Sequence, residues 1–195
     1  LRRSRGLGDV YKRQEYAHAR VAYLLGDYTS YYQNRMNLNP FNHLDPFGTF
    51  ALYFLGFGWA KPVPVVIQNL KNPRTDMMMI AMAGPASNMF LACLASIIYR
   101  LNFYFQFSEE VIFPLEIFIQ INIVLAVFNL LPINPLDGSR ILPLLVKNPR
   151  TLYNIEVYGP RILIGLIILN LIGVPILSTI ILTPVSIIFY LLTGA

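Results

Sequence analysis

The chain has 195 residues, of which 55% are hydrophobic and only 13% carry a charge. Charged residues make up about a quarter of an average soluble domain, so the composition excludes an ordinary soluble protein and predicts a membrane protein. The length allows one domain with a few spanning segments, but not two independent folds. The formal net charge of +5 is small for a nucleic-acid binder. Because the basic residues are scattered through predicted loops, we expect no nucleic-acid partner.

The first fourteen residues differ in character from the rest of the chain. They begin without methionine and are too polar for the apolar core of a secretory signal. Residues 8–14 look like a translated junction at the edge of a fragmentary reading frame. We therefore expect residues 1–14 to be a non-native leader and residues 15–195 to form one membrane-embedded domain that is incomplete at its N-terminus. The alternative is a genuine basic cytosolic tail.

The first structural region begins at Glu15. Residues 15–25 are mostly Ala, Val, Leu and Tyr, a helical composition, and Gly26-Asp27 is a helix stop. Residues 28–45 are polar and rich in asparagine, which favours a loop. The apolar stretch 47–60 contains several glycines and is short for a crossing helix, so it predicts a re-entrant loop or a β-hairpin.

A first complete span is predicted in the stretch 77–107, after a loop that includes Lys71, Arg74 and Asp76. Pro85 suits the first turn of this helix, which should run to about Tyr104. Twenty residues at about 1.5 Å each cross the hydrocarbon core of roughly 30 Å.

A second helix should start at Ser108, a plausible N-cap, and end near Leu131, because Pro132 follows. Within it, Gln120 and Asn122 are expected to form hydrogen bonds between helices. Residues 138–160 are predicted as a loop. Pro160 can then open a last apolar region, 161–192, which is either one kinked span or two short ones.

Charge asymmetry between the loops predicts the orientation. Loops 61–76 and 138–161 are net basic, whereas residues 102–110 carry acidic side chains and no Lys or Arg. Basic loops remain in the cytosol, so Asp137 should lie close to the cytosolic side of a membrane, the plasma membrane of a prokaryote. His18 would lie at a similar depth if residues 28–45 are cytosolic.

Asp137 places a carboxylate at the end of a long apolar run, where a charge is expensive unless it coordinates, pairs or transfers something. Far upstream, Glu15 and His18 occupy the last positions of an H-E-x-x-H pattern. In that pattern histidines at i and i+4 share one helix face and bind zinc, while the Glu handles the proton of a water. A carboxylate as third ligand leaves a fourth position for that water. Position 14, where the first histidine belongs, is Gln14.

Several short motifs follow one another in a fixed order and together cover nearly everything after Gln14. They are Glu15-Tyr16-Ala17-His18-Ala19, Leu25-Gly26-Asp27, Asn39-Pro40, His43-Leu44-Asp45-Pro46, Gly58-Trp59-Ala60-Lys61-Pro62-Val63-Pro64, Gly84-Pro85-Ala86-Ser87-Asn88 and Asn129-Leu130-Leu131-Pro132-Ile133-Asn134-Pro135-Leu136-Asp137-Gly138. This ordered set resembles the site-2 protease family of intramembrane zinc metalloproteases. A match to H-E-x-x-H alone would be weak, but the ordered set is specific.

The resemblance implies an all-α polytopic helix bundle in the lipid bilayer, with His18 and Asp137 as Zn²⁺ ligands and Glu15 as the catalytic base. The expected reaction is hydrolysis of a peptide bond in a membrane-spanning protein or peptide substrate. The family's first histidine falls at Gln14, a mismatch that we attribute to the sequence junction. As written, the chain should bind zinc poorly, because an amide is a weaker zinc ligand than imidazole.

Three asparagines, Asn88, Asn129 and Asn134, are candidates for contacts with the substrate or the transition-state oxygen. The alternative for Asn88 is tight helix packing among small residues. His18 could instead form a hydrogen bond between helices, and Asp137 could be an ordinary turn residue.

Two other classes of function stay open on the sequence alone. An ion or proton translocator could place Asp137 and His18 on its path, although the chain has no internal repeat of the kind from which secondary transporters are commonly built. A catalytically inactive membrane scaffold is the third class, and Gln14 taken literally supports it. The substrate, the regulator and the oligomeric state are not indicated.

Overall fold

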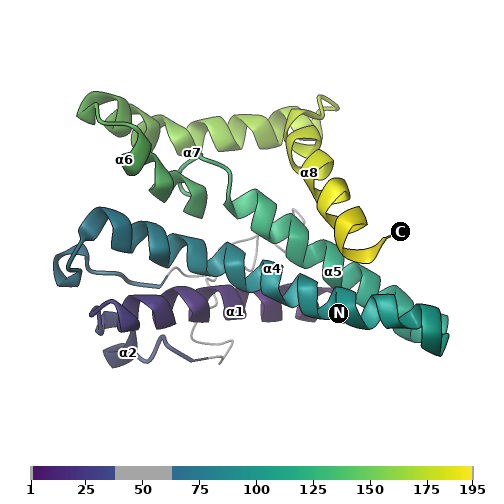
Figure 1. Ribbon diagram of the computed structural model, residues 1–195. Helices are drawn as coiled ribbons and strands as arrows, with labels where there is room; N and C mark the ends of the chain where they lie inside the picture. Colours follow the sequence, from purple (N-terminus) through teal and green to yellow (C-terminus); the bar gives the residue numbers. More distant parts are fainter. Residues whose placement is uncertain (1, 38–62, 195) are drawn as a thin grey trace. The chain divides into compact units, whose positions relative to one another are not determined.

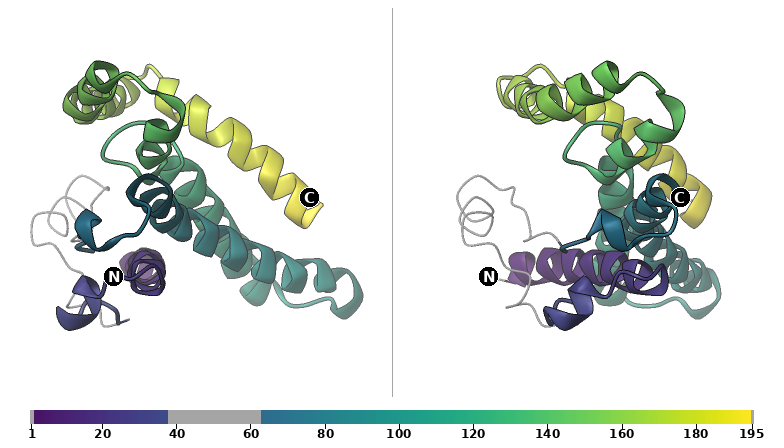
Figure 2. Two further views of the ribbon diagram at one scale, coloured as in Figure 1. Left: turned by 60° about the vertical axis from the view of Figure 1, so that its left-hand side comes forward. Right: turned by 90° about the vertical axis from the view of Figure 1, so that its left-hand side faces the viewer.

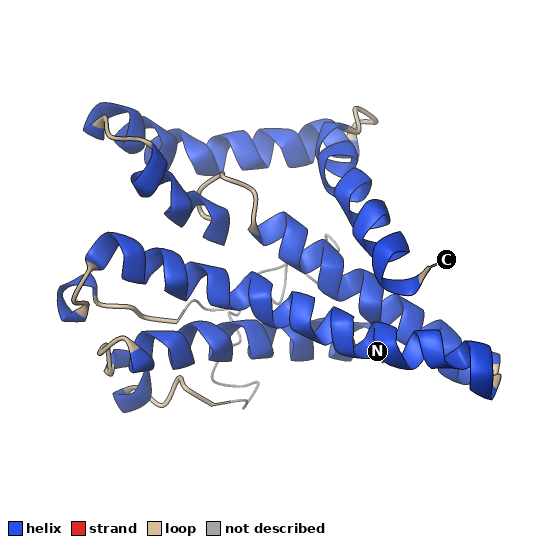
Figure 3. Cartoon of the chain, viewed as in Figure 1, coloured by secondary structure: helices blue, strands red, loops and turns tan. Residues whose placement is uncertain are grey.

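The computed structural model describes residues 2–37 and 63–194 (Figure 1). All regular elements in these two ranges are helical (Figure 3), which confirms the all-α prediction. The predicted re-entrant loop or hairpin at residues 47–60 lies outside the described residues. The chain divides into two compact units, residues 1–84 and 85–195.

In the first unit, helix α1 spans Arg2–Leu24. It ends where the sequence predicts, because Gly26 takes a positive φ of 105° and the backbone N–H of Asp27 bonds back to the carbonyl of Ala22. A short helix, α2, follows at Thr29–Tyr32. The expected leader forms the first half of α1, and its origin stays a prediction.

Asp27 is fully buried, and its carboxylate accepts hydrogen bonds from the residues just after it and from a segment much later in the chain. The backbone N–H of Thr29 donates at 3.1 Å, that of Val66 at 2.7 Å, and Nδ2 of Asn69 at 2.8 Å. Asn69 belongs to the 3-10 helix η2, Ile67–Asn69. The carboxylate therefore ties the end of α1 to a chain segment about forty residues further on.

Helix α4 spans Pro73–Phe105, so the prediction that Pro85 lies in the first turn is wrong, as is the predicted loop at Arg74 and Asp76. The true start is fixed by Asn72 and Asp76. The N–H of Asn72 donates to the Asp76 carboxylate at 2.8 Å, and the N–H of Asp76 returns a bond to the Asn72 carbonyl. Pro73 then sits at the first helical position, where its missing N–H costs nothing.

In the second unit, helix α5 spans Glu109–Asn129 with Ser108 at its N-cap, and both ends confirm the prediction to within two residues. After Pro132 the chain forms a 3-10 helix, η3, at Asp137–Ile141 and a short helix, α6, at Leu142–Leu145. In the first turn of α5, the carboxylates of Glu109 and Glu110 stabilise the start of the helix, because negative charge there interacts favourably with the helix dipole.

The last apolar region forms two helices, α7 at Pro149–Leu171 and α8 at Ile176–Thr193. The predicted loop at 138–160, and Pro160 as a helix opener, are therefore wrong. Asn148 caps α7 instead, because its side chain accepts a hydrogen bond from the N–H of Arg150 at 3.0 Å. Between α7 and α8, Gly173 has a positive φ of 94° and allows the turn.

The core of the second unit is formed by the C-terminal half of α4 together with α5 and α8. In Figure 2, α8 (yellow) runs beside α5 (teal to green). The buried residues of this core are Ala92, Ala95, Ile119, Ile123, Leu177, Ile181 and Val185. Arg100 of α4 donates to the carbonyls of Leu191 and Leu192 at 2.7 and 2.6 Å, which satisfies orphan carbonyls near the C-terminus of α8.

Gln120 and Asn122 make intrahelical hydrogen bonds, where the sequence predicts interhelical ones. Nε2 of Gln120 donates to Glu116, and Nδ2 of Asn122 donates to the carbonyl of Phe118. Both acceptors lie one helical turn earlier, and short polar side chains within a helix readily reach back that far.

Among residues 2–37 and 63–194, four helices are long and apolar enough to cross a membrane: α4, α5, α7 and α8. Large apolar side chains on them are exposed, including Phe90, Phe113, Ile164 and Leu182. Apolar surfaces of this kind on spanning helices face the hydrocarbon core of a lipid bilayer. The protein is an integral membrane protein.

Candidate metal and catalytic site

Gln14, Glu15 and His18 lie on consecutive turns of α1. Gln14 and His18 are four residues apart and therefore share one face of the helix. Both side chains are buried, with only 4% and 8% of their surfaces exposed, and Glu15 is half-buried. The structure thus brings together the three positions of the H-E-x-x-H pattern, with an amide at the first.

The ring of His18 is held by a backbone carbonyl of α4. Its Nδ1 lies 2.7 Å from the carbonyl oxygen of Ile80. Because a carbonyl can only accept, Nδ1 must carry the hydrogen, and the lone pair of the neutral ring is on Nε2. Metal-binding histidines characteristically use their second nitrogen in this way, since the bond fixes both the tautomer and the ring orientation.

Gly84 lies directly against this pair of side chains. A Cβ atom placed on Gly84 would be 2.5 Å from Nε2 of His18 and 2.6 Å from Cγ of Gln14. In the sequence, Gly84 is noted only as the first residue of the motif Gly84-Pro85-Ala86-Ser87-Asn88. A signal was nevertheless present, since glycine in a helix interior costs about 1 kcal/mol relative to alanine and needs a packing or functional reason.

Glu15 is positioned by the segment that follows the undescribed residues. The backbone N–H of Val63 donates to Oε2 of Glu15 at 3.0 Å. The same segment is fixed one residue on, where the hydroxyl of Ser30 donates to the carbonyl of Pro64 at 2.8 Å, and again at Val66, which bonds to Asp27. The carboxylate of the expected base is therefore oriented by an anchored stretch of backbone.

In the second unit, Asp137 is the first residue of η3, and its side chain is partly buried. The Asn134–Pro135 peptide bond just before it is cis. Gly138 follows because the chain folds back against the end of α5. A Cβ there would overlap the carbonyl group of Leu130 and lie 2.6 Å from the carbonyl oxygen of Leu131.

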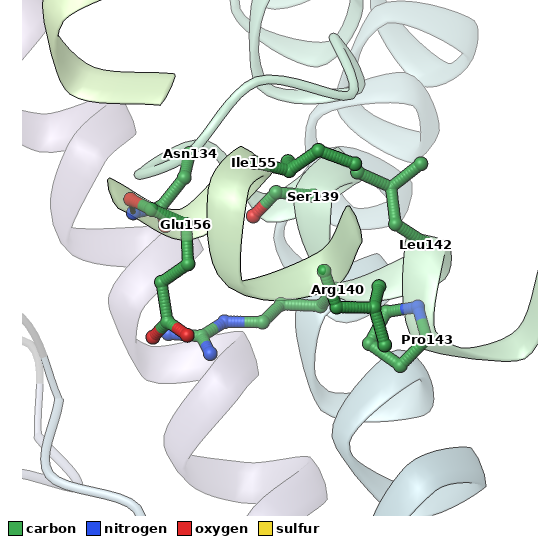
Figure 4. Close-up of a pocket in the computed structure, with 8 residues that line it drawn as sticks. Asn134, Ser139, Arg140, Leu142, Pro143, Ile155 and Glu156 are labelled. Atoms are coloured by element: carbon green, nitrogen blue, oxygen red, sulfur yellow. Dashed lines mark hydrogen bonds between the residues drawn. The ribbon is translucent and has the colours of Figure 1, made fainter. Parts of the chain in front are cut away.

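Helix α7 braces the loop that presents Asp137. Nδ2 of Asn134 donates to the carbonyl of Glu156 at 3.1 Å. Beside this bond lies a small cavity of about 90 Å³, and Figure 4 shows Asn134, Ser139, Arg140 and Glu156 around it. The sequence does not indicate this support, because residues 138–160 are predicted as a loop.

Gly159 of α7 lies against Asn134 with no room for a side chain. Gly159→Ala should therefore lower the free energy of unfolding by about 1–3 kcal/mol, the usual cost of overpacking. The added Cβ would lie 2.8 Å from Cβ of Asn134 and 2.9 Å from its backbone nitrogen. Chemical unfolding in detergent measures the change. Gly165→Ala in the same helix is the matched control, because nothing lies within 4 Å of its Cβ position. Equal stability of the two variants would contradict the bracing role.

The asparagine candidates differ in what they already bind. Nδ2 of Asn129 donates to the carbonyl of Leu125 at 2.9 Å, and Asn134 binds Glu156 as described. Asn88 has no exposed surface, and within the described ranges neither its Oδ1 nor its Nδ2 has a hydrogen-bond partner. Contacts of all three with a substrate stay predictions.

Among residues 2–37 and 63–194, no group of three His, Cys, Asp or Glu side chains is gathered closely enough to hold a metal. His18 belongs to the first unit and Asp137 to the second. Their pairing as ligands of one ion therefore stays a prediction.

The fold and these residues define a polytopic α-helical membrane protein with a Glu-x-x-His sequence on a buried helix face. A family profile described as "Peptidase family M50" matches residues 105–172. The chain is also 45% identical over 138 residues to "Putative zinc metalloprotease YwhC" of Bacillus subtilis (strain 168), an alignment covering 68% of this chain and 63% of that relative. The chain thus spans less than two thirds of that relative's length. No solved structure matches it. The profile match and the similarity to this relative confirm the resemblance to the site-2 protease family.

Proposed function

We propose that this chain carries the catalytic centre of an intramembrane zinc endopeptidase of the site-2 protease type, which hydrolyses peptide bonds of membrane-spanning substrates. The single observation that carries the proposal is the orientation of the His18 ring. Its Nδ1 is hydrogen-bonded to the Ile80 carbonyl, and its Nε2 lies beside the side chain of Gln14, where both pack against Gly84. The match to the profile of peptidase family M50 and the similarity to a protein named as a putative zinc metalloprotease support it.

His18 and Asp137 would hold the zinc ion, and residue 14 would complete the set of protein ligands. The residues fit this role in part. The ring of His18 is prepared for a metal by its bond to Ile80, whereas the amide of Gln14 is a weak ligand for zinc. When bound, zinc would polarise the scissile carbonyl and lower the pKa of a water toward about 7.

Glu15 would act on protons. Its carboxylate accepts one proton from the attacking water as the new carbon–oxygen bond forms, and donates it to the amine as the carbon–nitrogen bond breaks. The N–H of Val63, 3.0 Å from Oε2, fixes the orientation of the carboxylate.

Asn88 would bind the substrate backbone or the oxyanion of the transition state. A buried amide without partners costs about 1–3 kcal/mol, which a ligand contact would relieve. Helix α4 places Asn88 one turn after Gly84 and on the same face. Asn129 and Asn134 are weaker candidates, because their amides already donate to backbone carbonyls.

The extended substrate would pair with backbone at residues 63–66. Pro64 and Val66 are used by contacts within the first unit, whereas no described residue bonds to the backbone of Val65. An extended chain can add to such an edge. If the segment 47–64 receives the substrate, its deletion should abolish cleavage. Basic residues in the first turns of α4 and α7, Arg74 and Arg150, would place the site near the cytosolic face of a prokaryotic plasma membrane.

The proposal is tested by comparing the 195-residue chain with its Gln14→His variant in detergent. We expect the variant to hold about one zinc per chain and to cleave a transmembrane peptide, because imidazole supplies the missing ligand. The chain as written should hold less zinc. Metal content is measured by mass spectrometry, and peptide products by chromatography. His43→Gln in the variant is the control, since the resemblance to site-2 proteases assigns no metal ligand to the motif His43-Leu44-Asp45-Pro46. A variant with no more zinc than its parent would overturn the proposal.

A second function is favoured by one observation, the glutamine at position 14. If the native residue is glutamine, the chain would be a membrane scaffold of the same fold without protease activity. Reading the genomic locus across position 14 separates the two. A histidine codon there, together with zinc in the variant, favours the protease.

A further inference from the structure

We infer that Gly84 is a positioning residue for the metal site: its missing side chain lets α4 approach α1 closely enough for the Ile80 carbonyl to hold the ring of His18 with Nε2 presented to a metal. The inference rests on the proposed function, since it concerns the same site. It adds a residue and a backbone group that supply no ligand themselves.

The closeness of the approach supports this role. A Cβ on Gly84 would lie 2.5 Å from Nε2 and 2.6 Å from Cε1 of His18, and 2.6 Å from Cγ of Gln14. Carbon contacts this short do not occur in packed interiors, so something would have to move. The contacts fall on both members of the i, i+4 pair, which means that one methyl group would disturb both expected ligand positions.

The hydrogen bond of His18 shows why the ring cannot simply yield. Its acceptor, Ile80, lies four residues before Gly84 and on the same face of α4. If α4 moved back to accommodate a methyl at position 84, the 2.7 Å bond from Nδ1 to the Ile80 carbonyl would lengthen. If the ring rotated instead, the same bond would break. Either response loses the orientation of Nε2.

The side chain of His18 has little space in which to shift away from an added methyl group. His18 is only 8% exposed, and Ala19 and Ala22 of the same helix are fully buried. Glycine is also a poor choice for helix stability at position 84, which is followed directly by a proline inside α4. Gly165 of α7 is different, since nothing lies within 4 Å of its Cβ position.

The first test reads the tautomer of His18 in the chain as it exists. The sequence contains only two histidines, so a ¹⁵N-histidine spectrum shows two rings, and His43→Gln assigns them. At a pH where the rings are neutral, we expect His18 to carry its hydrogen on Nδ1. Gly84→Ala should shift the ring toward the Nε2–H form. Hydrogen on Nε2 in the parent chain would overturn the inference, whatever the metal content.

The second test measures zinc affinity by competition with a chelator, in the Gln14→His chain. Gly84→Ala should weaken binding about 10–100-fold, as loss of an orienting partner does, while Gly165→Ala should leave it unchanged. Equal affinity of the Gly84→Ala variant and its parent would overturn the inference. If the Gln14→His chain itself binds no zinc, the proposed function fails instead, and the tautomer decides the role of Gly84. The tautomer in the parent also decides it if Gly84→Ala does not fold.

Discussion

Glu15→Gln, introduced into the Gln14→His chain, should reduce peptide cleavage by about 10²- to 10⁴-fold while leaving one zinc bound per chain. This is the range that a general acid–base group contributes. The amide of glutamine keeps the size of the side chain and can still accept the hydrogen bond from the N–H of Val63. It cannot take the proton of the attacking water. Initial rates of peptide cleavage and metal content, measured on the same preparation, give the two readouts.

A ligand substitution should give a different result, which makes the comparison informative. Asp137→Asn in the same chain should lose zinc and cleavage together, because an amide replaces the carboxylate ligand. Glu116→Gln, at an α5 carboxylate that contacts Gln120, is the control and should change neither. Cleavage by the Glu15→Gln variant at the rate of its parent would rule out Glu15 as the base.

The positions of the helices could largely be predicted, but several of their starts could not. The helix stop at Gly26 and the helix start after Ser108 are confirmed, because each of these sequence signals has only one structural interpretation. Proline has two meanings: it suits a first turn and is also tolerated inside a long membrane helix. Pro85 and Pro160 are of the second kind. The true starts are marked by Asn72 and Asn148, each followed by a proline.

The candidate site could be predicted only as far as side chains define it. The order of motifs indicates Glu15, His18 and Asp137, because carboxylates and imidazoles have recognisable chemistry. The partners of two of these residues are backbone groups, the carbonyl of Ile80 and the N–H of Val63. Every non-proline residue carries such groups, so nothing in the sequence distinguishes the ones that are used.

Asp27→Asn should lower the free energy of unfolding at neutral pH by about 2–3 kcal/mol, the value of hydrogen bonds to a buried charge. The carboxylate accepts bonds from the backbone of Thr29 and Val66 and from the amide of Asn69. An asparagine would turn its own NH₂ group toward one of these donors. Because the Val66 bond anchors the segment that orients Glu15, the variant should also cleave more slowly in the Gln14→His chain. Chemical unfolding in detergent measures the first effect.

The pH dependence of the stability shows whether the charge of Asp27 or only the packing of its side chain stabilises the protein. Burial raises the pKa of Asp27, but the hydrogen bonds from Thr29, Asn69 and Val66 outweigh it, and the pKa lies below its usual value. A carboxyl whose folded pKa is below the unfolded value of about 3.9 stabilises the protein above that value and loses this contribution as the pH falls through the folded pKa. The stability difference between the parent and Asp27→Asn should therefore be full at pH 7 and shrink below about pH 4. Glu110→Gln, at an exposed carboxylate of α5, should show no such difference. A constant difference from pH 7 to about pH 3 would show that shape at position 27 matters, and not charge.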